Sequence, residues 1–260
     1  MRAIRSTTAG VALLLLGTIA PARAQTPVRQ AGLDLGIYAG GAWSSDWYEA
    51  RMASSTSGVV TSTGDETGYG LGITSSFGAM ATYWLHPSLG VRLHGAYLPS
   101  PLPRAEGDEG NGNPVNNYLY DLDVLYRPWA GRPGAPGPLA SLYAFAGGGG
   151  LTVNIAGGDG ASRCEPASLS RGACLTRQPG AASVGQGVLG IGAELLALGS
   201  GLGAFAEIAA HGYESPAHTG DGFIPATTVR PGAAFAISDD AFAVTTRLVV
   251  GVKWSSTTQP

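Results

Sequence analysis

The stretch Tyr118-Leu-Tyr-Asp-Leu-Asp-Val-Leu-Tyr126 alternates strictly between two kinds of side chain. The even-numbered positions (one parity) hold only tyrosine and aliphatic residues. The odd-numbered positions (the other parity) hold Leu119, Asp121, Asp123 and Leu125. A period of two residues indicates a β-strand whose two faces meet different surroundings. Here one face is apolar enough for lipid and the other carries two carboxylates. This pattern is typical of a strand in a transmembrane β-barrel.

Seven other segments show the same period, although the alternation is weaker in the sixth and seventh of the eight, which are rich in glycine and alanine. Most are near or above the ~9–11 residues that a tilted strand needs to cross a bilayer. The connections between them alternate between long and short, as the outer loops and periplasmic turns of such barrels do. The sequence therefore predicts an all-β fold, an eight-stranded antiparallel up-and-down transmembrane β-barrel. The predicted strands are Leu33–Trp43, Tyr69–Tyr83, Val91–Tyr97, Tyr118–Tyr126, Tyr143–Ile155, Val184–Leu196, Leu202–Tyr213 and Phe242–Trp254.

The composition agrees with a membrane barrel and excludes other classes. Glycine supplies 41 of 260 residues and charged residues only 13%, against usual values of ~7% and ~25%. There is no Gly-X-Y period, which excludes collagen, and 44% hydrophobic residues with a net charge of −3 argue against disorder. Without a basic excess to neutralise phosphates, nucleic acid is not expected as a partner.

The N-terminus predicts export. Arg2 and Arg5 precede a ten-residue apolar run at 11–20, which ends at Ala22-Arg23-Ala24. A basic start, a short apolar core and an A-x-A end are typical of a cleaved secretory signal peptide. We therefore expect a signal peptide at 1–24, a short N-terminal segment at 25–30, the barrel at 31–254 and a C-terminal tail at 255–260. The expected location is the bacterial outer membrane.

Aromatic residues with the lipid-facing parity gather at the two ends of the predicted strands. Tyrosine and tryptophan favour the membrane–water interface, because their rings are apolar and their polar atoms reach the headgroups. The alternative is that these rings are core residues of a soluble β-sandwich. The predicted outer girdle is Trp43, Tyr69, Tyr97 and Tyr118, and the inner girdle is Tyr83, Tyr126, Tyr143 and Trp254.

The alternate positions of the strands, which face away from the lipid, predict a charged lumen. An eight-stranded barrel encloses about enough room for its own side chains, so these charges must pair. We expect Lys253 near Asp34, His94 near Asp123, and Arg247 beside Glu194 and Glu207. A structural salt-bridge network that fills the barrel is the simpler interpretation; a switchable gate of Glu194, Glu207 and Arg247 on a small ion path is the alternative. The predicted lumen set is Asp34, Arg92, His94, Asp121, Asp123, Glu194, Glu207, His211, Arg247 and Lys253.

The third long connection holds both cysteines, Cys164 and Cys174. In an exported chain two cysteines this close are expected to form a disulfide. Most of the other acidic residues fall in the long connections, where they form a solvated rim or, alternatively, bind divalent cations that bridge to anionic lipid or saccharide. No metal site and no cofactor is predicted.

Catalysis is not expected. The only local serine, histidine and acid set is His211, Glu214 and Ser215. Parity directs His211 into the lumen, whereas Ser215 precedes Pro216 at the start of a loop. The run of glycines at 147–150 lacks the Lys-Ser/Thr and helix of a phosphate-binding loop.

Eight strands, a signal peptide and the last strand, Thr246-Arg-Leu-Val-Val-Gly-Val-Lys-Trp254, resemble the small outer-membrane barrels of the OmpA/OmpX type. The chain departs from that pattern in the residues 255–260 that follow the terminal aromatic residue, and they are too few for a wall-binding domain. The resemblance implies a monomer that is inserted by the barrel-assembly machinery and surrounded by outer-membrane lipid and lipopolysaccharide. It implies a structural or surface-interaction role. The alternatives are a narrow, porin-like barrel that conducts ions or small solutes, and a soluble exported lipid-binding barrel.

Overall fold

The computed structural model describes the barrel and parts of its long connections. The predicted signal peptide and segment 25–30 lie outside the described residues, as do the side chains of the short strands beyond the barrel. None of the described residues forms a helix long and apolar enough to cross a membrane. The described ranges are 32–56, 59–62, 67–70, 72–101, 114–130, 141–155, 162–164, 174–176, 180–199, 201–216, 226–228, 233–239 and 242–256.

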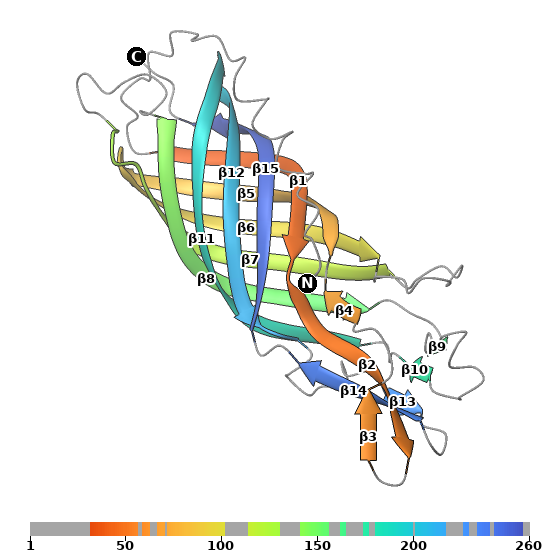
Figure 1. Ribbon diagram of the computed structural model, residues 1–260. Helices are drawn as coiled ribbons and strands as arrows, with labels where there is room; N and C mark the ends of the chain where they lie inside the picture. Colours follow the sequence, from red (N-terminus) through yellow and green to blue (C-terminus); the bar gives the residue numbers. More distant parts are fainter. Residues whose placement is uncertain are drawn as a thin grey trace.

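Eight antiparallel strands close into one barrel in the order β1-β15-β12-β11-β8-β7-β6-β5 (Figure 1). Each barrel strand pairs with the barrel strands that precede and follow it along the chain. The last strand, β15, closes the barrel by pairing with the first, β1. The predicted eight-stranded up-and-down barrel is confirmed. The barrel strands are β1 (Gly32–Ser44), β5 (Ile73–His86), β6 (Leu89–Pro101), β7 (Pro114–Tyr126), β8 (Leu142–Ile155), β11 (Gly180–Gly199), β12 (Leu202–Glu214) and β15 (Phe242–Ser255).

The second predicted strand begins too early. The segment from Tyr69 to Tyr83 is broken by Gly72, whose φ of 59° bends the backbone into a conformation that glycine adopts at little cost. Residues before this bend form β4 (Thr67–Gly70), which pairs with β2 (Asp46–Thr56) outside the barrel. Only the part from Ile73 onward enters the barrel as β5.

Strands also form within the long connections, where the sequence predicts loops. β2 pairs with β14 (Ala233–Asp239), with β3 (Val59–Ser62) and with β4. A separate sheet joins β9 (Ser162–Cys164), β10 (Cys174–Thr176) and β13 (Ala226–Thr228). Both sheets lie beyond the same end of the barrel in Figure 1. We call this end the loop end and the opposite one the turn end.

The turn end carries two tight hairpins. β5 and β6 are joined through Pro87 and Ser88, and β11 and β12 through a turn that contains Gly201. Gly201 has a φ of 80°, and a Cβ atom there would lie 2.6 Å from the Ser255 carbonyl oxygen. Its own carbonyl accepts a 2.9 Å hydrogen bond from the Ser255 amide. Glycine at this position therefore lets β15 end against the turn.

Candidate functional site

The ten residues predicted to face the lumen all lie on the inner side of the barrel strands. Nine are buried, and Glu194 is partly exposed. They come from β1, β6, β7, β11, β12 and β15, so the polar side chains converge from most of the barrel wall. The two faces differ sharply, since inward Arg92 is 1% exposed whereas its outward neighbour Leu93 is 63% exposed.

Arg92 is the centre of one group of contacts. Its Nε and Nη2 atoms donate to Asp123 Oδ2 at 3.0 and 2.7 Å, and Nη1 donates to Glu207 Oε1 at 2.6 Å. The Tyr143 hydroxyl donates to the same Glu207 oxygen at 2.6 Å. The guanidinium carbon also lies 4.1 Å from the ring centre of Phe145. One buried cation thus serves two carboxylates, which is how buried charges are stabilised away from water.

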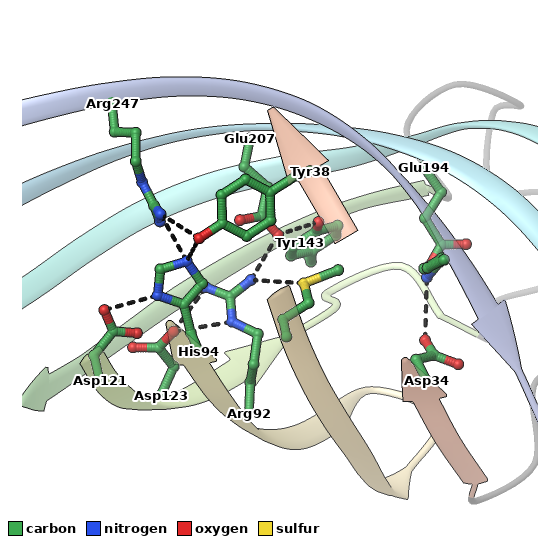
Figure 2. A network of polar contacts seen from close by, with 12 residues as sticks. Asp34, Tyr38, Arg92, His94, Asp121, Asp123, Tyr143, Glu194, Glu207 and Arg247 are labelled. Carbon is green, nitrogen blue, oxygen red and sulfur yellow. Dashed lines mark hydrogen bonds and ion pairs between the residues drawn. The ribbon is translucent and has the colours of Figure 1, made fainter. Parts of the chain in front are cut away.

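A second group of contacts surrounds His94 (Figure 2). Arg247 Nη1 donates to His94 Nε2 at 2.7 Å and to the Tyr38 hydroxyl at 2.8 Å. Because a guanidinium can only donate, His94 Nε2 accepts, and the ring proton belongs on Nδ1. Nδ1 then donates to Asp121 Oδ2 at 3.0 Å. The Tyr38 ring stacks on the imidazole, with 5.3 Å between ring centroids.

His211 lies beside the second group without joining it. Its Nδ1 atom is 3.9 Å from Asp121 Oδ2, and neither ring nitrogen finds a hydrogen-bond partner among the described residues. No group of three or more His, Cys, Asp or Glu side chains within the described ranges is arranged to hold a metal ion.

A third group of contacts closes the turn end. Lys253 Nζ donates to Asp34 Oδ2 at 3.1 Å and also pairs with Glu194, which pairs with Arg127 as well. The indole of Trp84 donates to Asp34 Oδ2 at 2.9 Å, and the Arg127 guanidinium lies 3.8 Å from the Trp84 ring centre. Lys253 therefore lies next to Asp34, where it was expected.

Arg127 and Trp84 also face the lumen, although they are absent from the predicted set. Each continues the inward alternation by one step beyond the predicted end of its strand, Arg127 after Leu125 and Trp84 after Thr82. Extending the period of two past the predicted strand ends would have found both.

One predicted neighbourhood is wrong. His94 lies opposite Asp121, and Asp123 lies opposite Arg92, so the register between β6 and β7 differs by two residues from the one expected. Glu194, Glu207 and Arg247 lie diagonally across the adjacent strands β11, β12 and β15. Each of the three pairs with other residues, as described above. The alternative of a gate built from this trio stays a prediction.

Apolar side chains fill the lumen toward the loop end. Leu98, Leu119 and Leu151, from three adjacent strands, are buried in one cluster with Tyr213. The Tyr213 hydroxyl contacts Thr245 Oγ1 at 2.7 Å and Ser44 Oγ at 3.2 Å. The lumen thus holds ion pairs toward the turn end and apolar packing toward the loop end.

The outer face carries large apolar side chains along the barrel, for example Ile37 at 64% exposed. Exposed rings mark both ends. Trp43 and Tyr118 lie near the loop end, where half-buried Tyr97 packs against Tyr118 with 5.5 Å between ring centroids. The exposed rings near the turn end are Tyr83, Tyr126 and Trp254.

Two of the eight predicted girdle residues are placed elsewhere. Tyr143 is buried in the lumen, together with Phe145, because β8 turns its large residues inward and its alanines outward. Tyr69 belongs to β4, where its backbone lies opposite Tyr48 of β2, outside the barrel.

Cys164 and Cys174 lie directly opposite each other on β9 and β10. Their side chains lie outside the described residues, so the disulfide stays a prediction. The long-connection acidic residues are likewise without described side chains, apart from exposed Glu214.

A closed antiparallel barrel with a charged, filled lumen and an apolar exterior ringed by aromatic side chains defines the class of this protein. It is a small transmembrane β-barrel.

Comparison with known proteins finds solved structures that are similar to this chain at low sequence identity. No family model and no curated protein matches the chain. Among solved structures, the outer membrane protein OprG of Pseudomonas aeruginosa is 14% identical, with a TM-score of 0.46 over 87% of this chain and 97% of that one. Ail of Yersinia pestis is 9% identical, with a TM-score of 0.36 over 87% and 100%. The N-terminal β-barrel domain of Pseudomonas aeruginosa OprF is 13% identical, with a TM-score of 0.33 over 86% and 100%. Similarity at this level does not extend to function.

Proposed function

We propose that this protein is a non-enzymatic barrel of the bacterial outer membrane with a structural or surface-interaction role. The observation that carries the proposal is the polarity of the two barrel faces. Large apolar side chains are exposed on the outside, while charged ones such as Arg92 and Asp123 are buried inside. A soluble lipid-binding barrel needs the opposite arrangement, since its ligand occupies the interior and water surrounds it.

The filled lumen favours a structural role over conduction. Ion pairs occupy the turn end and the middle, and Leu98, Leu119 and Leu151 pack across the loop end. An ion would have to separate these groups and shed its own hydration to pass. No described contact favours the narrow, conducting alternative.

The finer assignment to the OmpA/OmpX type rests on the strand number and on the sequence of the last strand. With it come the proposed partners, namely outer-membrane lipid and lipopolysaccharide around a monomer, and the barrel-assembly machinery during insertion. The strands that extend beyond the loop end would provide the surface for interaction with other molecules.

Expression of the full chain, followed by membrane fractionation, tests this proposal. We expect the protein in the outer-membrane fraction, with a faster gel migration before boiling than after it, because a closed barrel resists detergent until heated. Recovery as a soluble protein would contradict the proposal. In planar bilayers we expect no stepwise conductance; steps with a defined solute cutoff would establish the conducting alternative.

A further inference from the structure

The fourth long connection, between β12 and β15, contributes one strand to each small sheet at the loop end. β13 pairs with β10 of the third long connection, whereas β14 pairs with β2 of the first. Backbone pairing therefore ties the first, third and fourth long connections together. We call these seven strands (β2, β3, β4, β9, β10, β13 and β14) the loop head.

β10 is the middle strand of its sheet and carries Cys174, whereas Cys164 lies on β9. Cys174 faces Cys164 on one side and Thr228 of β13 on the other. Residues directly opposite each other in an antiparallel pair have Cα atoms ~4.5–5.5 Å apart. That separation lies within the ~4.4–6.8 Å that a disulfide requires. The register thus suits a cross-strand bridge.

We infer that a Cys164–Cys174 disulfide acts as a latch in the loop head, which orders β13 of the fourth long connection although both cysteines belong to the third. Strands of three residues are too short to persist without support. A covalent bridge between β9 and β10 lowers the entropy cost of holding these two strands together, and so presents β10 as a fixed edge on which β13 pairs.

The latch forms by thiol–disulfide exchange. The thiolate of one cysteine attacks the disulfide of an enzyme that oxidises the thiols of exported proteins, and forms a mixed disulfide with it. The thiolate of the other cysteine then attacks this mixed disulfide and displaces the enzyme. The two cysteines lose two protons and two electrons, and the oxidant leaves as a dithiol. A small-molecule dithiol reverses the exchange and opens the latch. The latch rests on the proposed function in one respect only, because an outer-membrane location implies export through an oxidising compartment.

Hydrogen exchange on the folded full-length barrel in lipid nanodiscs tests the latch. The oxidised protein is compared with the protein reduced by dithiothreitol and with the Cys164→Ser/Cys174→Ser double variant. We expect the amides of β13 (Ala226–Thr228) to exchange at least tenfold faster in both bridge-free samples. β14 (Ala233–Asp239) is the matched control within the same connection, because it pairs with β2 and not with β10; its exchange should not change.

Equal exchange of β13 with and without the bridge would overturn the latch, and so would equal acceleration of β13 and β14. Alkylation and mass measurement of the exported protein should find no free thiol; two free thiols would overturn the disulfide itself. Membrane fractionation is read separately. A protein that misses the outer membrane yet shows the β13 effect when oxidised in vitro would refute the proposed function and leave the latch standing.

Discussion

Arg92 donates hydrogen bonds to carboxylates on two different strands, Asp123 of β7 and Glu207 of β12. All three side chains are buried, so water does not solvate their charges. Removing one partner of a buried ion pair is far more damaging than removing an exposed pair, because the remaining charge stays buried. Arg92 is therefore the residue on which the middle of the lumen depends most.

We predict that Arg92→Met lowers the free energy of unfolding by about 3–5 kcal/mol, since two carboxylates lose their cation. Urea unfolding of the barrel in lipid vesicles, followed by tryptophan fluorescence, measures this. The triple variant Arg92→Met/Asp123→Asn/Glu207→Gln should recover most of the loss, because it leaves no uncompensated charge. A loss of at most ~1 kcal/mol for the single variant, the range of exposed ion pairs, would contradict the buried network.

At this scale the sequence predicted which residues face the lumen better than it predicted their partners. Parity alone places a side chain inside, and it did so for Asp121, Asp123 and His94. Pairing also needs the register between neighbouring strands, which a two-residue shift changes without altering any parity. His94 consequently pairs with Asp121, and the expected contact with Asp123 is taken by Arg92.

Glycine and aromatic residues face each other across the barrel strands. In each such pair the ring covers the space that a side chain on the opposite glycine would need. Covering strand glycines with aromatic side chains stabilises curved sheets. The pairs are Tyr38 with Gly78, Trp84 with Gly90, Tyr120 with Gly150, Tyr143 with Gly192, Phe145 with Gly190, and Phe205 with Gly251.

These pairs explain why the predicted face of Tyr143, on β8, is wrong. The alternate positions of β8 hold large apolar residues on one face and small residues on the other, and either face suits lipid. Inside the barrel, however, Gly190 and Gly192 of β11 leave room that only Phe145 and Tyr143 fill. The partner glycines belong to another strand, so the alternation of β8 alone could not decide the face.

We predict that Gly78→Ala destabilises the barrel by about 1–3 kcal/mol. The new methyl group would collide with the Gly95 carbonyl oxygen, and also with the Tyr38 hydroxyl, which donors such as Arg247 hold in place. Gly95→Ala on the next strand is the matched control, since nothing lies within 4 Å of a Cβ there. It should change stability by no more than ~0.5 kcal/mol. Equal effects of the two substitutions in urea unfolding would contradict the close packing at Gly78.

The strands of the loop head could not be predicted from local pattern. β2 is eleven residues long, but its partners β3, β4 and β14 come from two different connections. β10 and β13 have three residues each and are separated by the whole of β11 and β12. Short strands of this kind form only because distant segments meet, and one sequence does not reveal such meetings.

At the scale of the whole molecule, the chain has few charges because most of its barrel surface faces lipid. The charges that remain in the lumen are paired. The order of the strands, the alternation of short and long connections and, apart from Tyr69 and Tyr143, the two aromatic girdles could be predicted from the sequence. What the structure adds is the pairing of the lumen charges toward the turn end and in the middle, and the apolar cluster with Leu98, Leu119 and Leu151 toward the loop end.

The central claim, that the barrel exterior contacts lipid and the lumen does not, is tested most directly by tryptophan quenching with brominated lipids. Three variants each keep one tryptophan, Trp43, Trp254 or Trp84, and replace the others by Phe. Trp43 and Trp254 are 44% and 45% exposed on the outer face, whereas Trp84 is 2% exposed in the lumen. We predict strong quenching of Trp43 and Trp254 and weak quenching of Trp84. Quenching of Trp84 as strong as that of Trp254, or no quenching of the outer pair, would contradict the account.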